Sequence, residues 1–182
     1  EDYDTQGEDH ACLAAGTKII TEAGNIPIER VQVGDRVLTP KGYRKVTGAA
    51  RTALGARVYR VSIDHGACLI GTGNHPIFVI GRGFTAITDL KAGDRLLAYR
   101  GKEGCQEMPR VVSVESAGRA DVYNLSVDGV HAYVANGVLV HNCDALGYGL
   151  MSRPYTPERP KEAEGARHYR RRRDSAASAW TT

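Results

Sequence analysis

Short stretches in which apolar and polar residues alternate run through most of the chain. Residues 58–64 (VYRVSID) and 122–128 (VYNLSVD) follow a period of two, which is typical of half-buried strands. Asn136-Gly137 separates two apolar triplets and predicts a tight hairpin turn. Helical periodicity is scarce, and we expect only short helical turns at 27–32 and 86–91. The pattern therefore predicts an all-β domain.

Three sequence elements occur twice in the same order, which indicates an internal duplication. The first pair shares a Gly-Asp-Arg turn, the second a Val-Tyr strand, and the third a histidine followed by apolar residues. Two copies are too few for a solenoid, so we expect one domain of two intertwined halves related by a pseudo-two-fold axis. In this alignment His131 is the counterpart of His75. The aligned pairs are 26–39 with 85–98, 58–64 with 122–128, and 75–79 with 131–135.

The β pattern stops at both ends of this region, and the flanking sequences are compatible with helix instead. Joining Ala11 directly to Cys143 gives DTQGEDHACDALGYGLMSRPY, which has the pattern of one continuous helix. The helical pattern is broken when the β region lies between its two parts, and it is continuous when Ala11 is joined directly to Cys143. We therefore divide the chain into a flank 1–11, an inserted domain 12–142 and a second flank 143–182.

Composition and charge narrow the class of protein. A chain of 182 residues with 42% hydrophobic and 25% charged residues fits one globular domain with appendages. It has no run of about 18 apolar residues, so we expect no membrane contact. Its acidic first residues are unlike a basic signal peptide, so we expect a cytoplasmic protein. We also expect a monomer. The polar tail 154–182 carries Arg170–Arg173, and we expect nucleic-acid contact only through this tail or the host protein.

The four cysteines argue against metal and disulfide chemistry. Cys12, Cys68, Cys105 and Cys143 include no C-x-x-C pair, the spacing typical of zinc and thioredoxin-like sites. A disulfide framework is not expected in a chain of this length without a secretion signal. We expect no cofactor and no metal in the inserted domain.

The residues at the two ends of the inserted domain are those that a peptide rearrangement requires. Cys12 can attack the carbonyl of its preceding peptide bond through a five-membered ring, which converts the amide into a thioester. Cys143 can then take the acyl group by thiol–thioester exchange. Asn142 can cyclise onto its own carbonyl and cut the bond that follows it. The freed amine of Cys143 finally recaptures the acyl group, which joins it to Ala11 by a normal peptide bond.

Other polar residues can assist these steps. An amide is stabilised by resonance, so its cleavage needs help. A protonated His75 near the scissile amide nitrogen would favour its departure, and Thr72 would hydrogen-bond that amide or its oxyanion. His131 and His141 can act as base on the Asn142 amide or stabilise the oxyanion there.

Taken together, these segments resemble the splicing blocks of inteins. The opening CLAAGTKI, the segment GTGNHPIF, and the closing VYNLSVDGVHAYVANGVLVHN followed by Cys are similar to the N-terminal, Thr-x-x-His and C-terminal blocks. The resemblance covers 12–143 and implies the horseshoe-like Hint fold, shared with hedgehog autoprocessing domains. It implies that the domain acts on its own flanking segments as partners. The roles it implies are Cys12 as first nucleophile, Thr72 and His75 in activating the upstream bond, His131, His141 and Asn142 in C-terminal cleavage, and Cys143 as second nucleophile.

The sequence departs from the intein pattern in several places. Asn124 stands where inteins often carry Asp, and Asn cannot act as a base. Cys68 and Cys105 match no block residue. The length leaves no room for the homing endonuclease that many inteins hold, so the resemblance is to a mini-intein with Arg100–Met108 as the vestigial insertion point.

The flanks resemble a second family. GEDHA joined to CDALGYGLMSR is similar to the end of the nuclease domain of phage terminase large subunits, where a DALRYGL-like helix supplies a metal-binding Asp. The resemblance implies that Asp144 is this residue in the spliced host, although Gly147 departs from the usual Arg.

Three hypotheses follow from the sequence. The first is splicing in cis. The second is autocleavage without ligation, as in intein-like or hedgehog-like domains, against which a second nucleophile argues. The third is an inert β-scaffold that serves as an interaction module, with its basic tail binding nucleic acid.

Overall fold

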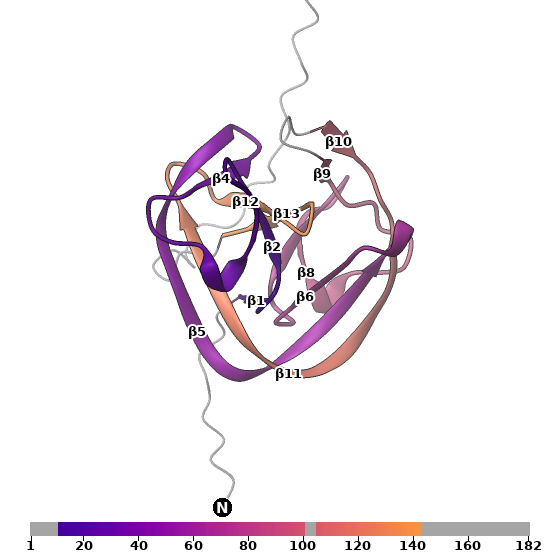
Figure 1. The fold of residues 1–182 in the computed structure, drawn as a ribbon. Coiled ribbons are helices and arrows are strands. Elements are labelled where there is room, and N and C mark those ends of the chain that lie inside the picture. The colour runs from indigo at the N-terminus through magenta and orange to yellow at the C-terminus, as the bar shows by residue number, and fades with distance from the viewer. Residues whose placement is uncertain (1–10, 101–104, 143–182) are drawn as a thin grey trace, which may run out of the picture.

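The computed structural model describes residues 11–100 and 105–142, and all the regular structure in them is strand or 3₁₀ turn (Figure 1). No α-helix occurs among these residues, as the sequence predicted. The strands are β1 (Leu13–Ala14), β2 (Lys18–Thr21), β3 (Gly24–Pro27), β4 (Arg36–Thr39), β5 (Gly42–Ile63), β6 (Cys68–Gly71), β7 (Pro76–Val79), β8 (Gly83–Ala86), β9 (Ala98–Arg100), β10 (Cys105–Glu107), β11 (Val111–Val127), β12 (Ala132–Ala135) and β13 (Val138–His141). The 3₁₀ turns are η1 (Ile28–Arg30), η2 (Asp64–Gly66) and η3 (Ile87–Asp89).

Two long strands form the frame of the molecule. β5 and β11 pair antiparallel over almost their whole length, and five register shifts in this ladder let the pair bend. Figure 1 shows the paired strands β5 and β11 curving together round the lower edge of the molecule and rising on both its left and its right side. The pair thus surrounds β1, β2, β12 and β13. This arrangement is the horseshoe-like architecture that the resemblance implied.

The predicted duplication is confirmed by matching hydrogen bonds around the two Gly-Asp-Arg turns. In the first half, the Gly34 N–H donates to the Val46 carbonyl, and in the second the Gly93 N–H donates to the Val111 carbonyl, at 2.9 and 2.8 Å. Both glycines have a positive φ, of 104° and 90°, which favours glycine at this position of the turn. The expected helical turns are present as η1 and η3, one before each Gly-Asp-Arg turn.

The third aligned pair was wrong, because His131 is not the counterpart of His75. The Ile28 N–H donates to the Thr17 carbonyl, and the equivalent Ile87 N–H donates to the His75 carbonyl. The strands that follow, β2 and β7, each pair with the next strand in a hairpin. Thr17 is therefore the counterpart of His75. The sequence alignment failed because the segments after His75 and His131 share only a strand pattern.

The hairpin of β12 and β13 serves both halves instead. Ala135 of β12 pairs with Ile19 of β2, and Val140 of β13 pairs with Ile77 of β7. The predicted turn between them is confirmed, with φ angles of 48° at Asn136 and 80° at the following glycine. The closing segment of the domain thus lies where the two halves meet.

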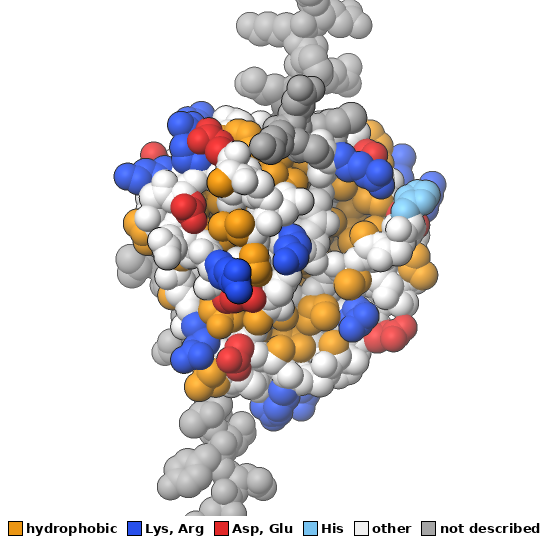
Figure 2. Space-filling view, viewed as in Figure 1, with side chains coloured by type: hydrophobic (Ala, Val, Ile, Leu, Met, Phe, Trp, Pro, Cys, Tyr) orange, Lys and Arg blue, Asp and Glu red, His pale blue; other side chains and the backbone are white. Residues whose placement is uncertain are grey.

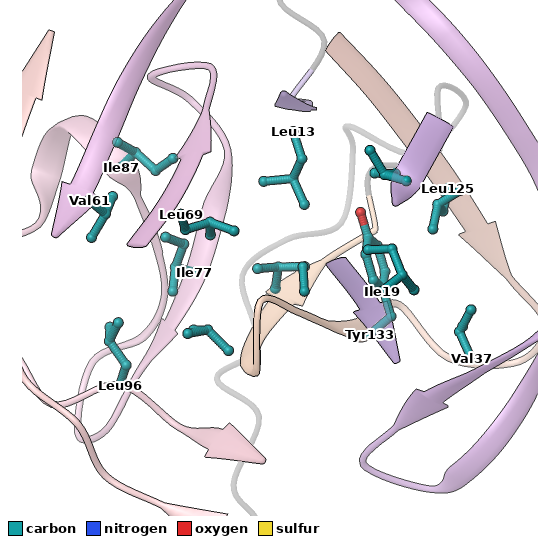
Figure 3. Close-up of a cluster of buried hydrophobic side chains, with 14 of the residues drawn as sticks. Leu13, Ile19, Val37, Val61, Leu69, Ile77, Ile87, Leu96, Leu125 and Tyr133 are labelled. Atoms are coloured by element: carbon teal, nitrogen blue, oxygen red, sulfur yellow. The ribbon is translucent and has the colours of Figure 1, made fainter. Parts of the chain in front are cut away.

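The hydrophobic core contains equivalent residues from both halves of the duplicated domain. Figure 3 shows Ile19, Val37 and Leu125 on one side of a single buried cluster, facing a second group on the other side with Leu13 between them. These residues are at most 1% exposed. The three pairs of residues that are equivalent in the two halves are Ile19 and Ile77, Val37 and Leu96, and Leu125 and Val61.

A closed ring of strands holds the beginning of the domain. β1 pairs with β11 and with β6, while β5 pairs with β11 and with β6, so these four strands close on themselves. β1 has only two residues, yet it lies between two longer strands and is buried. The residue just before β1, Cys12, is consequently drawn into the interior at 0% exposure.

The outer surface carries charges of both signs. Figure 2 shows Lys and Arg side chains interspersed with Asp and Glu side chains and small apolar areas over the visible face. Within the part of the chain that the structure describes, no helix has the length and apolar character needed to cross a membrane.

Candidate functional site

The backbone of Cys12 is held by the loop that follows β6. The Cys12 N–H, which belongs to the peptide bond after Ala11, donates to Thr72 Oγ1 at 2.9 Å. The Thr72 N–H donates to the Cys12 carbonyl, also at 2.9 Å. This pair continues the register of Leu13 with Gly71 and places Thr72 directly opposite Cys12. The predicted contact of Thr72 with this amide is therefore formed.

Glycines on both sides of Thr72 allow this close approach. A Cβ at Gly71 would lie 2.9 Å from the Cys12 carbonyl oxygen, and one at Gly73 would lie 2.8 Å from Thr88 Cγ2. Both distances are too short for carbon, and the first involves backbone that cannot move aside. The Gly-Thr-Gly sequence thus brings the threonine hydroxyl to the amide without a side chain between the two strands.

Asn74 orients the Thr72 hydroxyl. Thr72 Oγ1 lies 2.7 Å from Asn74 Oδ1 and 3.4 Å from the Cys12 carbonyl oxygen. The hydroxyl has one proton, and the shorter contact takes it. A lone pair of Thr72 Oγ1 is then left to accept the hydrogen bond from the Cys12 amide.

The thiol of Cys12 is fully buried beside a second threonine. Cys12 Sγ lies 2.8 Å from Thr52 Oγ1, and the Thr52 hydroxyl lies 3.1 Å from the Val122 carbonyl oxygen. Burial raises the pKa of the Cys12 thiol, and the hydrogen bond with Thr52 acts in the opposite direction. The thiol is therefore protonated at neutral pH and needs a base before it can attack.

His75 lies at the other end of the same loop and is also completely buried. Burial lowers its pKa to about 4, the backbone of Ala11 acts to raise it, and the charge of His141 lowers it further. No described residue forms a well-aligned hydrogen bond with either ring nitrogen, although the Ala11 backbone is close enough to affect the pKa. Burial therefore favours the uncharged form of His75 at neutral pH, so the protonated imidazole expected beside the departing amide nitrogen requires that His75 first takes up a proton.

The C-terminal end of the domain is held by the segment before β12. The Asn142 N–H donates to the His131 carbonyl at 3.1 Å. In the orientation that satisfies both ends of its side-chain amide, the nitrogen donates to the same carbonyl at 3.2 Å and the oxygen accepts from the Val127 N–H at 3.0 Å. Asn142 is 0% exposed, so water does not compete for these groups.

Two aromatic rings fix His141 next to Asn142. The His141 ring packs edge-on against Phe84, with centroids 4.9 Å apart, and stacks on His131 at 6.1 Å with an interplanar angle of 10°. His141 is 5% exposed, whereas His131 remains open to solvent. The pair can therefore connect the buried joint with water.

The two joints share one loop. β13 pairs with β7 through Val140 and Ile77, and this antiparallel register, continued by two residues, places Asn142 opposite His75. Three residues earlier in that loop, Thr72 lies opposite Cys12. The repulsion that His141 exerts on a charged His75 is further evidence that the two joints form one site.

The structure brings together six of the seven residues predicted for the site, and it adds others. Cys143 and Asp144 lie outside the described residues. Thr52 and Asn74 were not predicted, because neither belongs to a pattern that the sequence distinguishes from an ordinary strand or loop residue. The six residues are Cys12, Thr72, His75, His131, His141 and Asn142.

Two other residues singled out from the sequence differ in their place relative to this site. The antiparallel register of Leu13 with Tyr123, continued by one residue, places Asn124 of β11 opposite Cys12. Cys68 is half-buried at the start of β6 and pairs with Ser62. The described residues include no group of three His, Cys, Asp or Glu side chains that could hold a metal ion.

Comparison with known proteins agrees with this geometry. The family model described as the pretoxin HINT domain matches residues 18–143, which is more than half of the chain. The chain belongs to the pretoxin HINT domain family. The matched part of this HINT domain includes Thr72, His75 and the whole C-terminal joint, and it begins six residues after Cys12. No matching protein is found among curated sequences.

Solved structures similar to this HINT domain include inteins. The gp41-1 intein is 25% identical, with a TM-score of 0.64 over 74% of this chain and all of that chain. A bacterial intein-like domain from Clostridium thermocellum is 28% identical, with a TM-score of 0.63 over 74% of this chain and all of that chain. A DnaB intein from Synechocystis, at 20% identity and a TM-score of 0.67 over 74% of this chain and all of that chain, shares the fold. The HINT domain thus belongs with protein-splicing and autoprocessing domains.

Proposed function

We propose that this HINT domain splices itself out of its chain, releasing residues 12–142 and joining Ala11 to Cys143. The observation that carries the proposal is the loop 72–75, whose first residue holds the amide before the domain and whose last residue lies opposite Asn142. A reaction that cuts both joints and exchanges an acyl group between them needs the joints in one place.

The first step is an isomerisation of the bond before Cys12. Neutral His75 takes the thiol proton, Sγ attacks the Ala11 carbonyl carbon, and the C–N bond breaks as the proton is delivered to the departing nitrogen. A sulfur–carbon bond replaces a nitrogen–carbon bond, and no atom is gained or lost. Thr72 holds the amide nitrogen in place during attack.

The second half of the reaction uses the other joint. Cys143 takes the acyl group from Cys12 by thioester exchange, and the Asn142 side-chain nitrogen then attacks its own carbonyl and releases the amine of Cys143. In the structure this nitrogen is held by the His131 carbonyl, so cyclisation begins with its release. His141 lies beside Asn142 and His131 connects it to solvent, which suits both to proton transfer.

Intact mass spectrometry of the full chain after incubation at neutral pH with a reductant tests the proposal. We expect one mass for 12–142 less one water, from the succinimide, and one for 1–11 joined to 143–182. Cys12→Ala should abolish ligation, Asn142→Ala should accumulate thioester or branched species, and the matched control Cys68→Ala should splice. Ligated product from Cys12→Ala would contradict the assignment of the nucleophile.

Cleavage without ligation is the second candidate. The contacts that hold Asn142 come from His131 and Val127, and neither belongs to the N-terminal joint. Cleavage after Asn142 can therefore proceed alone and release 143–182, a reaction that also suits a family described as pretoxin. Free flanks without the joined product in the same mass spectra would favour this candidate.

The host protein is a separate proposal. The flanks resemble the nuclease region of a phage terminase large subunit, with Asp144 as a metal ligand after splicing, but this resemblance lies outside the described residues. The joined 1–11 and 143–182 product would have to be placed in a complete nuclease to test it. Rescue of metal-dependent cleavage there, lost again with Asp144→Ala, is the expected result.

A further inference from the structure

The nucleophile has a polar neighbour to which the proposed reaction gives no role. Thr52 Oγ1 lies 2.8 Å from Cys12 Sγ and 3.1 Å from the Val122 carbonyl oxygen. A carbonyl oxygen can only accept, so in the resting protein Thr52 donates its proton to Val122 and accepts the proton of the thiol. This is the arrangement while the thiol keeps its proton; a hydroxyl proton turned to the sulfur instead favours the thiolate and lowers the thiol pKa.

The backbone places Thr52 at this point through an irregularity in the long ladder. Along β5, Arg51 pairs with Tyr123 and Ala53 pairs with Val122, so Thr52 has no partner of its own in the register. An extra residue of this kind is a β-bulge, which changes the direction of a side chain and often lies next to an active site. The bulge opposite Val122 is therefore the feature that brings the Thr52 hydroxyl close to both the Val122 carbonyl and Cys12 Sγ.

We propose that Thr52 is a catalytic residue of the first step, which turns its hydroxyl proton from the Val122 carbonyl to Cys12 Sγ when the thiolate forms. The inference rests on the proposed function, in which Cys12 is the first nucleophile. Rotation about the Cβ–Oγ1 bond is enough, because both acceptors lie within hydrogen-bond distance of the same hydroxyl oxygen. No backbone atom has to move.

The need for such a donor follows from burial. Cys12 is 0% exposed, so water cannot solvate a thiolate there, and burial raises the pKa of the thiol. A buried charge without a hydrogen bond is costly, and a donated hydrogen bond to it is stronger than one to a neutral group. Thr52 is the hydroxyl that touches the sulfur.

The hydroxyl returns to its starting position as the reaction proceeds. The thiol proton leaves to the base, the sulfur–carbon bond forms and the carbon–nitrogen bond breaks, with the proton delivered to the nitrogen. The thioester sulfur is uncharged and a poor acceptor, so the Thr52 proton turns back to the Val122 carbonyl. Thr52 donates a hydrogen bond but keeps its proton bonded to Oγ1 throughout, so the step remains balanced.

The test uses the Asn142→Ala chain, in which the second half of the reaction is blocked. Dithiothreitol cleaves a thioester at Cys12, so the rate of release of residues 1–11 between about pH 6 and 10 reports the first step. Thr52→Val keeps the shape without the hydroxyl and should slow release about 10- to 100-fold at neutral pH, with the rise of the pH profile moved to higher pH. Thr52→Ser should restore the rate to within about threefold.

A matched control separates this effect from the loss of any buried hydroxyl. Thr39 is 2% exposed and its hydroxyl donates to the Gly42 carbonyl, away from the site, so Thr39→Val should leave the pH profile unchanged. Thr52→Ala, which introduces no bulk, serves if Thr52→Val does not fold. Unchanged release from Thr52→Val, or an equal loss at every pH that Thr52→Ser does not restore, overturns the inference.

A second measurement distinguishes failure of the inference from failure of the proposed function. Alkylation of Cys12 by iodoacetamide, followed on its own peptide by mass spectrometry, reports the same thiolate without any rearrangement. A parent chain that releases no residues 1–11 contradicts the proposed function. Identical alkylation profiles for the parent and Thr52→Val then contradict the inference as well, whereas a shift to higher pH in the variant supports it.

Discussion

The environment of His75 differs strongly from that of the free amino acid. It is completely buried, and its pKa is lowered to about 4 by burial and by the charge of His141, with the Ala11 backbone acting to raise it. The sequence proposed His75 for the site through the Thr-x-x-His segment, which resembles the corresponding block of inteins. Its protonation state could not be predicted, because burial depends on strands that are distant in the sequence.

The stability of the domain should depend on pH through His75. The folded pKa, about 4, lies below the value of 6.5 for an unperturbed histidine, so the unfolded chain binds the proton first as the pH falls. The contribution is complete above about pH 6.5 and is lost as the pH falls towards 4, by about 3 kcal/mol in total. Urea unfolding of an inert Cys12→Ala, Asn142→Ala chain, with and without His75→Gln, measures the difference.

The control is built into that comparison. Other groups titrate in the same range in both proteins, so only the difference between their free energies of unfolding is assigned to His75. A difference that stays constant from pH 7 to pH 4 would show that the imidazole titrates normally in the folded chain.

At the scale of elements, the position of the hairpin of β12 and β13 is fixed in part by the side chain of Asn136. Asn136 Oδ1 accepts from the Lys18 N–H at 2.6 Å, and its Nδ2 donates to the Cys68 carbonyl at 2.8 Å. Lys18 belongs to β2 and Cys68 to β6, so a single turn residue connects the hairpin with both halves. The sequence identified Asn136 as a turn residue, but these two bonds arise only in the folded molecule.

Asn136→Gly should lower the free energy of unfolding by about 1–3 kcal/mol. Glycine accepts the positive φ of 48°, so the loss reports the two side-chain hydrogen bonds and not backbone strain. Chemical denaturation measures it, and Asn25→Gly, at an exposed position of β3, is the control. Equal changes in the two variants would mean that the hairpin is held by β pairing alone.

The contact between β1 and β6 depends on the absence of a side chain. We expect Gly71→Ala to cost about 1–3 kcal/mol of stability and to slow the first step, because its Cβ would lie 2.9 Å from the Cys12 carbonyl oxygen. Gly48→Ala is the matched control, since its Cβ would meet only the Ser126 side chain, at 3.3 Å. Unfolding and dithiothreitol cleavage measure both effects, and equal behaviour of the two variants would contradict this account.

At the scale of the whole molecule, local patterns predicted the all-β class, the duplication and both joints. Each of these leaves a signal within a few residues, such as a Gly-Asp-Arg turn or an alternating strand. The alignment of His131 with His75 failed because it depended on which strands pair, and Thr52 was missed because a register shift between distant strands places it. Long-range pairing is the information that the local patterns lack.

Insertions should be tolerated at one end of the sheet and not at its centre. β10 pairs with β9 alone and ends the strand order, so a ten-residue Gly/Ser insert between Arg100 and Cys105 should change the free energy of unfolding by less than about 1 kcal/mol. The same insert between Asn136 and Gly137 should abolish the reaction. Intact masses and denaturation of both chains test whether Arg100–Met108 is an insertion point.

The closed ring of β1, β6, β5 and β11 also has a consequence for timing. A ribosome makes Cys12 first, but the groups around it follow much later: Thr72 and His75 from the middle of the chain, and Val122 and His141 near the end of the domain. Strands paired across such long separations assemble slowly and only when both are present. For the proposed splicing reaction, this means that Cys12 stays inert on the growing chain until the last strand has emerged from the ribosome. The order of synthesis would then keep the first joint intact until both flanks have been made.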